Sequence, residues 1–338
     1  MSERTSDVVL SVKNLHVSFY TNRRCNKVLR GVSFDIRRGR TLCVVGESGC
    51  GKSVTANAIL RLLPELSRIE QGSVSYWQEG GQEIRLDQLK KNGREMRALR
   101  GKDIAIIFQD PMTALNPVYT VGRQIREMIR QHRRGMSRRE LKRESVRGLA
   151  AMGIPAADIR DGEYPHQFSG GMRQRAMIAM ALSCNPKLLI ADEPTTALDV
   201  TIQAQIMDLL VELKDKINTA IILITHDLGV VAGIADRVAV MYAGRKVEEG
   251  SVEQILFNPQ HPYTKALKGC IPHLQRTPTS GRHRLHEIPG MVLGMAELGK
   301  DRCSFYERCP CGKPECMEHN PPAKAIDAGH EVACWLYS

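Results

Sequence analysis

The sequence predicts an α/β fold with a mostly parallel sheet, an antiparallel β-subdomain and a helical subdomain. Three observations support this prediction. Apolar strands alternate with helical segments in the second half of the chain, as in a parallel sheet covered on both faces. Short strand-like runs follow one another closely in the sequence near the N-terminus, which is typical of antiparallel strands. From Thr120 to about Pro186 the residues have helical spacing and no long β-branched runs.

The β-type runs near the N-terminus predict the antiparallel subdomain. They occupy residues 9–12, 17–19 and 32–36, and the last run alternates apolar and polar side chains. Residues 72–86 continue the pattern on both sides of a Gly-Gly turn. Strands of this kind are not part of a minimal βαβ unit, so we expect them to form an added sheet beside the core.

A glycine-rich turn lies between a strand and a helix and has the sequence Gly46-Glu47-Ser48-Gly49-Cys50-Gly51-Lys52-Ser53. The apolar run 41–45 precedes it, and the helix-compatible run 54–63 follows it. The glycines let successive N–H groups face an anion, and the helix N-terminus adds partial positive charge. We expect Lys52 to reach the β- and γ-phosphates and Ser53 to ligate Mg²⁺. The pattern in this context indicates a P-loop NTPase core.

The next core strand, residues 104–108, leads to Gln109 and ends there, because Pro111 cannot continue a central strand. The segment that follows, from Thr120 to about Pro186, is rich in Arg, Met and Ala. We therefore expect a helical insertion between core strands.

Within that insertion, Ser169 and two glycines open the helix-forming segment 172–182. Such a start can be a plain N-cap after a flexible turn, or a second anion-binding helix N-terminus. A chain with one P-loop needs only one phosphate cradle. The second cradle makes sense if it serves a nucleotide that another subunit holds.

Parallel-strand signals return at residues 188–191, 220–225 and 238–242, and an amphipathic helix lies between the first two. Asp192 and Glu193 end the first of these strands, so they are expected at the carboxyl edge of the sheet beside the P-loop. Asp192 suits Mg²⁺ and Glu193 suits a general base, although an ordinary strand end also reads this way. His226 follows the second strand and fits either a hydrogen-bonded loop residue or a γ-phosphate sensor.

The composition is that of a soluble globular protein of about two domains. Of the 338 residues, 42% are hydrophobic and 25% are charged. No apolar run approaches the roughly 18 residues of a membrane span, and the polar N-terminus lacks a signal-peptide core. The formal net charge is +11, but only 5% of residues are aromatic and none interrupts the basic run 130–143. We therefore expect a cytoplasmic protein with no nucleic-acid partner.

Six motifs in this order resemble those of an ATP-binding-cassette (ABC) ATPase, over about residues 8–260. They are Walker A at Gly46–Ser53, the Q-loop at Gln109, the signature at Ser169–Gln174, Walker B at Leu188–Glu193, the D-loop at Ala197–Asp199 and the switch histidine His226. In that family two cassettes pack head to tail, and each ATP lies between the Walker motifs of one and the signature of the other. The resemblance therefore implies ATP hydrolysis and not binding alone.

The resemblance also assigns roles to single residues. The implied catalytic residues are Glu193, His226, Lys52 and Gln109, and the implied Mg²⁺ ligands are Ser53, Gln109 and Asp192. Phe19 is expected to stack on adenine and is favoured over Tyr20. The full set of implied ATP-binding residues is Phe19, Gly46, Ser48, Gly49, Cys50, Gly51, Lys52, Ser53, Val54, Gln109, Asp192, Ser169, Gly170, Gly171, Gln174 and Asp199.

Three local segments, residues 110–117, 164–167 and 261–264, resemble the oligopeptide/dipeptide/nickel group of bacterial importer ATPases. This resemblance implies a second, different ATPase subunit, two transmembrane permease subunits and an extracytoplasmic substrate-binding protein. It places the chain at the cytoplasmic face of the inner or plasma membrane. Dipeptide or oligopeptide transport is favoured, and nickel or antimicrobial-peptide transport stays open. Two other classes of protein are the alternatives: a soluble ABC ATPase that acts on nucleic acid or ribosomes, and a metal-sensing module.

Five of the ten cysteines lie after residue 300. Cys303, Cys309, Cys316 and Cys334 are separated by five, six and seventeen residues, so four thiolates could hold a [4Fe–4S] cluster or Zn²⁺. Cys311 could replace Cys309 or Cys316, and free cysteines are the alternative. Resemblance to peptide-importer ATPases favours the iron–sulfur cluster. We expect residues 1–270 to form the nucleotide-binding domain, with its helical subdomain at about 112–186, and residues 271–338 to form a small Cys-rich C-terminal domain.

Overall fold

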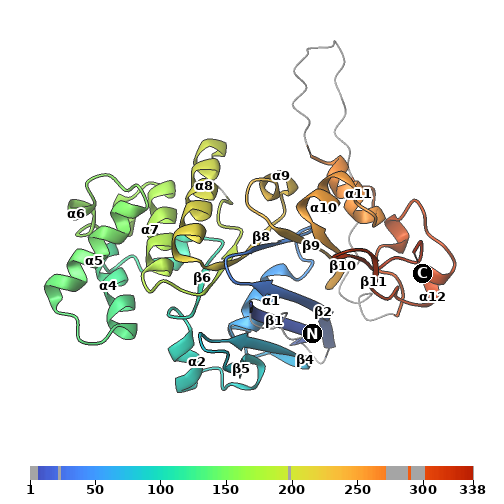
Figure 1. The fold of residues 1–338 in the computed structure, drawn as a ribbon, viewed down its shortest axis with the longest axis horizontal. Coiled ribbons are helices and arrows are strands. Elements are labelled where there is room, and N and C mark those ends of the chain that lie inside the picture. The colour runs from blue at the N-terminus through green and yellow to red at the C-terminus, as the bar shows by residue number, and fades with distance from the viewer. Residues whose placement is uncertain (1–6, 22–23, 197–198, 272–287, 291–300, 338) are drawn as a thin grey trace, which may run out of the picture. The chain divides into compact units, whose positions relative to one another are not determined.

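The computed structural model describes residues 7–21, 24–196, 199–271, 288–290 and 301–337 (Figure 1). The chain divides into two compact units, which we call the first unit (Met1–Leu10, Asp35–Thr41, Ser75–Ile224) and the second unit (Ser11–Phe34, Leu42–Val74, Thr225–Ser338). The expected D-loop residues Ala197 and Leu198 lie outside the described residues, as do residues 272–287 and 291–300 of the expected C-terminal domain. No helix in the described part of the chain is long and apolar enough to cross a membrane.

Three parallel strands form the core of the first unit: β6 (Ile104–Ile107), β7 (Leu188–Asp192) and β8 (Ala220–Thr225). Ile104 lies opposite Leu188, and Leu188 lies opposite Ala220. Every residue of β7 and β8 is buried, as expected for strands covered on both faces. The predicted parallel strands of this region are therefore confirmed.

The first unit also contains a group of packed helices, and α4, α5 and α7 all contact one another (Figure 1). Its α-helices are α2 (Arg94–Leu99), α3 (Pro111–Ala114), α4 (Val121–His132), α5 (Arg138–Ala151), α6 (Ala157–Arg160), α7 (Gly170–Leu182) and α8 (Val200–Ile217) among the described residues. A buried carboxylate joins three of these segments: Asp161 accepts from Arg126 at 2.7 Å and from Ser145 at 2.6 Å. Gly122 must lack a side chain, because a Cβ there would lie 1.8 Å from an Asp161 oxygen.

The second unit has strands in both directions. β3 (Thr41–Val45) runs parallel to β9 (Arg237–Tyr242). Its first residue, Thr41, is assigned to the first unit and the rest of the strand to the second. β10 (Arg245–Ser251) is antiparallel to β9. The C-terminal tail adds a hairpin of β11 (Lys324–Asp327) and β12 (His330–Val332), and β12 pairs antiparallel with β10. The hairpin was not predicted, because strands of three and four residues are too short to show a period.

The predicted antiparallel strands are present. β1 (Val8–Thr21) joins two of the expected runs into one strand of 14 residues, and it is followed by β2 (Arg24–Arg37). The last residues of β4 (Ser67–Trp77) pair antiparallel with β5 (Glu83–Arg85) around the Gly-Gly turn.

The described α-helices of the second unit are α1 (Lys52–Ile59), α9 (Leu228–Val231), α10 (Val252–Phe257), α11 (Pro262–Gly269) and α12 (Glu315–Glu318). Short 3₁₀ helices lie at Leu86–Gln88, Pro165–Gln167 and Tyr306–Arg308.

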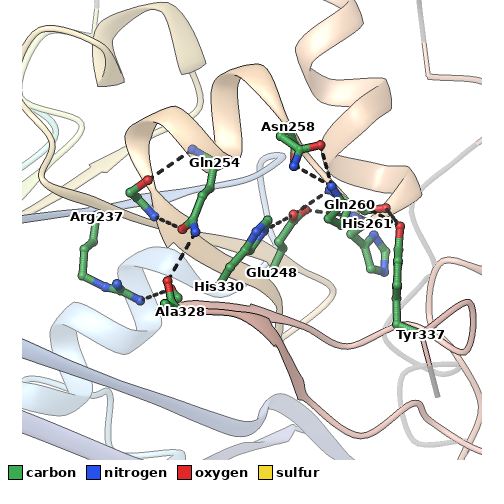
Figure 2. A network of polar contacts seen from close by, with 11 residues as sticks. Arg237, Glu248, Gln254, Asn258, Gln260, His261, Ala328, His330 and Tyr337 are labelled. Carbon is green, nitrogen blue, oxygen red and sulfur yellow. Dashed lines mark hydrogen bonds and ion pairs between the residues drawn. The ribbon is translucent and has the colours of Figure 1, made fainter.

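A buried carboxylate attaches the C-terminal hairpin to β10 (Figure 2). The Glu248 side chain is 0% exposed and lies 2.8 Å from the Nε2 atom of His330, whose side chain is 2% exposed. Its two oxygens also accept the backbone N–H groups of Gln260 at 2.7 Å and His261 at 3.0 Å. One carboxylate therefore links β10, β12 and the turn before α11, which is the kind of full satisfaction that a buried charge requires.

Weaker polar contacts surround this carboxylate (Figure 2). Arg237 donates to Glu249 at 2.9 Å and to the Gly329 carbonyl at 2.9 Å. Gln254 donates to the Ala328 carbonyl at 3.3 Å, and the Tyr337 hydroxyl donates to the Gln260 side chain at 2.8 Å. Residues 328–337 of the tail are thus held by other elements of the second unit.

We expect Glu248→Ala to lower the free energy of unfolding by roughly 3 kcal/mol, because it leaves two N–H groups and an imidazole buried without an acceptor. Urea denaturation followed by circular dichroism measures the change. Glu253→Ala, at an exposed position of α10, is the matched control and should cost less than about 1 kcal/mol. Equal losses in the two variants would contradict the role of Glu248.

Candidate functional site

The glycine-rich turn of the second unit runs from β3 into α1, as the sequence predicts. Gly51 precedes α1 with φ at 103°, a left-handed conformation that favours glycine. A Cβ at Gly46 would lie 2.2 Å from the Met241 carbonyl oxygen, and a Cβ at Gly51 would lie 2.7 Å from Leu29. Both glycines are therefore required by close approach of the neighbouring strand segments.

Lys52 lies at the start of α1 and is 4% exposed. Its Nζ donates to the carbonyls of Gly46 at 2.7 Å and Glu47 at 3.1 Å, so the ammonium lies inside the curve of the loop. Ser48 and Gly49 are exposed, whereas Ser53 and Val54 are half-buried. Burial raises the pKa of the Cys50 thiol, which packs inside the loop.

The two candidate adenine-stacking residues differ in their surroundings. Phe19 is half-buried near the end of β1. Tyr20 is 38% exposed, but its hydroxyl donates to Glu70 at 2.5 Å and the Arg68 guanidinium lies 5.3 Å from its ring centre. Because these contacts hold the Tyr20 side chain, Phe19 remains the better candidate for stacking on adenine.

In the first unit, two of the predicted catalytic residues meet. The Gln109 amide donates to the Glu193 carboxylate at 3.0 Å, and the Thr196 hydroxyl donates to the same oxygen at 3.0 Å. Glu193 has a left-handed backbone with φ at 47°, and its N–H donates to the Ile224 carbonyl at 2.9 Å. Asp192 is the last residue of β7 and is 7% exposed. The strand end therefore carries a positioned carboxylate, and Thr196 is a partner that sequence reasoning missed.

The predicted signature segment starts α7. Ser169 is the N-cap, and its hydroxyl accepts the Met172 N–H at 3.3 Å. Ser169 and Gly170 are exposed, and Gly171 is half-buried against Ile202, where a Cβ would lie 3.2 Å from that side chain. Gln174 points inward, is 1% exposed and donates to the Pro194 carbonyl. The N-terminal end of α7 is therefore open to solvent while its next turn is fixed beside Walker B.

Two further predicted residues lie at the start of a helix and just after a strand. Asp199 is the N-cap of α8 and accepts the Ile202 N–H at 3.0 Å. His226 is exposed and follows β8. His226 belongs to the second unit, together with Lys52 and Ser53, whereas Gln109, Asp192, Glu193 and the signature segment belong to the first.

Sequence reasoning also missed the surroundings of Glu47, which lies inside the glycine-rich turn. Its N–H donates to the Tyr263 hydroxyl at 2.9 Å, and its carboxylate accepts two hydrogen bonds from Arg308. The signal was present in the sequence, because an acidic residue in a loop that binds phosphate needs a cation to neutralise it. The identity of that cation was not predictable, since Arg308 lies 261 positions further on.

The tail cysteines of the second unit line one small cavity of about 10 Å³; they are Cys303, Cys309, Cys311, Cys316 and Cys334. Burial, together with the neighbouring thiols, raises the pKa of Cys303 to about 11. The donor set therefore has the chemistry of a soft-metal site. The distances between these side chains do not support a metal site, because no group of three or more His, Cys, Asp or Glu among the described residues lies close enough to hold a metal ion.

Comparison with known families finds two matching models. One is described as ABC transporter and matches residues 29–196. The other is described as the C-terminal region of oligopeptide/dipeptide transporters and matches residues 247–316. The second match covers residues 247–251 of β10, the strand that pairs with the tail hairpin, and the first four of the tail cysteines.

Curated relatives match along nearly the whole chain. A probable peptide ABC transporter ATP-binding protein of Sinorhizobium fredii is 50% identical over 99% of this chain and 96% of its own length. A dipeptide transport ATP-binding protein of Bacillus subtilis is 48% identical over 97% of this chain and 94% of its own length. An oligopeptide transport ATP-binding protein of the same organism is 47% identical over 97% of this chain and 88% of its own.

Solved structures show the same fold. A dimeric ATP-binding cassette in a post-hydrolysis state, bound to ADP and phosphate, has a TM-score of 0.63 and 27% identity over 72% of this chain and 98% of its own. A component of a Clostridium perfringens ABC transporter complex has a TM-score of 0.60 and 26% identity over 75% of this chain and 92% of its own. The predicted fold, an ABC-type P-loop fold with a mixed sheet and helices, is thereby confirmed.

Proposed function

The chain belongs to the ABC transporter family of ATP-binding proteins, and on this premise we propose that it is the ATP-hydrolysing subunit of a bacterial di- or oligopeptide importer. The observation that carries the proposal is likeness over the whole length. Relatives named as peptide, dipeptide and oligopeptide transport proteins match 97% or more of the chain. The match to the oligopeptide/dipeptide C-terminal region supports the peptide assignment independently of the ATPase motifs.

We assign the phosphate cradle to the loop Gly46–Ser53. Its N–H groups and the start of α1 attract the phosphates, and Lys52 neutralises charge on the β- and γ-phosphates. The position of the ammonium inside the loop supports this role, since it lies within 3.1 Å of two loop carbonyls. Mg²⁺ would be held by Ser53 and Asp192, with Gln109 as the third ligand.

We assign the general base to Glu193. Hydrogen bonds from Gln109 and Thr196 fix its carboxylate, and the left-handed backbone after β7 turns the side chain away from the strand direction. A base held in this way can orient and deprotonate the attacking water. His226 would contact the γ-phosphate from the end of β8.

The second phosphate contact is assigned to the signature segment Ser169–Gln174, acting on a nucleotide held by another subunit. Support comes from the exposed N-terminal end of α7 and from the dimeric cassette to which the chain is similar. ATP would then join two subunits, and hydrolysis would release them. Asp199, as N-cap of α8, would lie in the D-loop beside that junction.

The remaining assignments follow the importer model. Residues 1–270 would be the nucleotide-binding domain and 271–338 the C-terminal domain. The partners would be a second, different ATPase subunit, two membrane permease subunits and an extracytoplasmic substrate-binding protein. The chain would then act as a peripheral subunit at the cytoplasmic face of the membrane.

We expect Glu193→Gln to lower ATP turnover by about 10²–10⁴-fold while ATP binding persists, because only the proton acceptor is lost. Phosphate release by the assembled transporter measures turnover, and equilibrium binding of labelled ATP measures affinity. Glu212→Gln, on the exposed face of α8, is the matched control and should leave both unchanged. Wild-type turnover in Glu193→Gln would exclude Glu193 as the base.

The finer proposal for the tail is a [4Fe–4S] cluster on Cys303, Cys309, Cys316 and Cys334, with Zn²⁺ as the alternative. It rests on the preference of thiolates for soft metals and on the one cavity that these thiols line, and it requires them to lie closer together than they do in this structure. Such a group would stabilise the tail, and no step of ATP hydrolysis is assigned to it. Cys311, on the same cavity, is the substitute ligand.

If the cluster is present, the anaerobically purified chain should be brown and contain about four iron atoms per molecule. Visible absorption and metal analysis of the wild type, Cys316→Ser and Cys25→Ser decide this. Cys316→Ser should lose iron and colour, whereas Cys25→Ser, at an exposed position outside the cavity, should keep both. Colourless protein with stoichiometric zinc would exclude the cluster, and protein with neither metal would exclude the site.

A further inference from the structure

Glu47 places a negative charge inside the loop that is assigned to the phosphates of ATP. Three of its groups are held: the N–H by Tyr263, the carbonyl by Lys52 at 3.1 Å, and the carboxylate by Arg308. An uncompensated carboxylate at this position would repel the phosphates of ATP and would pull Lys52 away from them. The loop therefore depends on a cation that comes from outside it.

Arg308 supplies that cation in a well-defined geometry. Its two terminal nitrogens donate to the two Glu47 oxygens at 2.7 and 2.9 Å, which is the bidentate arrangement that arginine favours. The other N–H groups donate to the Tyr242 hydroxyl at 3.3 Å and to the carbonyls of Ile288 and Pro289 at 3.2 and 3.0 Å. All five donors of the guanidinium are thus used, and its side chain is 5% exposed.

The segment that carries Arg308 is anchored by an aromatic cluster. Phe305 is 2% exposed and lies 5.2 Å from the Tyr242 ring and 5.4 Å from the Tyr263 ring. Tyr263 is the same residue that accepts the Glu47 N–H. The tail therefore reaches the phosphate loop through a packed core and not through a flexible surface contact. All of these residues belong to the second unit.

The geometry points to Arg308 as a positioning residue for ATP binding, which acts by neutralising Glu47 and fixing it in the loop. The C-terminal tail is then a structural part of the nucleotide site, and not only a region appended to the cassette. This inference rests on the proposed role of Gly46–Ser53 as the ATP cradle. It gives the tail a role in ATP binding that is separate from any role of the four cysteines.

The test measures binding of the fluorescent analogue mant-ATP, with Mg²⁺, to the full chain. Arg308→Ala should bind about tenfold more weakly, because the Glu47 charge now faces the phosphates unopposed. In the assembled transporter, KM for ATP should rise by a similar factor while kcat changes little. The double variant Glu47→Gln with Arg308→Ala should recover affinity to within about threefold of wild type, because neither charge remains.

Two further variants separate electrostatics from folding. Glu47→Gln alone leaves the guanidinium uncompensated beside the loop, so it should bind mant-ATP at least as tightly as wild type. Arg85→Ala removes another bidentate arginine–carboxylate pair, with Asp87 in the first unit, without touching the loop or the tail, and its affinity should be unchanged. If Arg308→Ala does not fold, Glu47→Gln still decides, since weaker binding by that variant contradicts the inference.

Several outcomes would overturn the role of Arg308: wild-type affinity in Arg308→Ala, a double variant as weak as Arg308→Ala, or an equal loss in Arg85→Ala. A wild-type chain that binds no nucleotide would contradict the ATP cradle itself, and the inference with it. A normal wild type with unaffected Arg308→Ala would contradict the inference alone.

Discussion

The proposed phosphate site imposes one constraint on the structure: backbone N–H groups must face the phosphates, so the backbone of the loop must curl tightly against its neighbours. Gly46 and Gly51 satisfy this constraint where the loop approaches Met241 and Leu29 closely. The same closeness lets Lys52 fold its ammonium over two loop carbonyls. A loop of this kind has little cohesion of its own, because its groups face inward and few of its side chains pack. Its shape must come from the elements around it.

Those elements come from distant parts of the sequence. Tyr263 in α11 accepts a loop N–H, and Arg308 in the tail holds the loop carboxylate. The tail is in turn attached to β10 by the buried carboxylate of Glu248. Two acids, the buried Glu248 and the half-buried Glu47, thus connect the tail to other elements of the second unit at separate points. Because a buried charge without its partner is costly, both contacts favour one arrangement of the tail over others.

The family was predictable from the sequence, and the comparisons confirm it. Strands such as Ala220–Thr225 were predictable to the residue, because a buried parallel strand is a continuous apolar run. The N-cap at Ser169 was also predictable, because capping depends only on residues that are adjacent in the sequence. The hairpin of β11 and β12 was not, because its strands are short and are stabilised by pairing with β10. The metal site stays a prediction, since cysteine spacing along the chain does not determine thiol spacing in space.

The sequence by itself determined the local chemistry: a glycine loop for phosphate, a strand that ends in two acids, and a helix that opens with serine and two glycines. These are short-range patterns, and a few adjacent residues suffice to specify them. Only the tertiary structure decided which distant groups meet them, namely Gln109 at Glu193 and Arg308 at Glu47. Such pairings follow from how strands and helices pack, and one arginine in a sequence of many cannot be assigned to one carboxylate without that packing. The glycine loop is therefore specified locally, while the residue that neutralises its acid is specified by the fold.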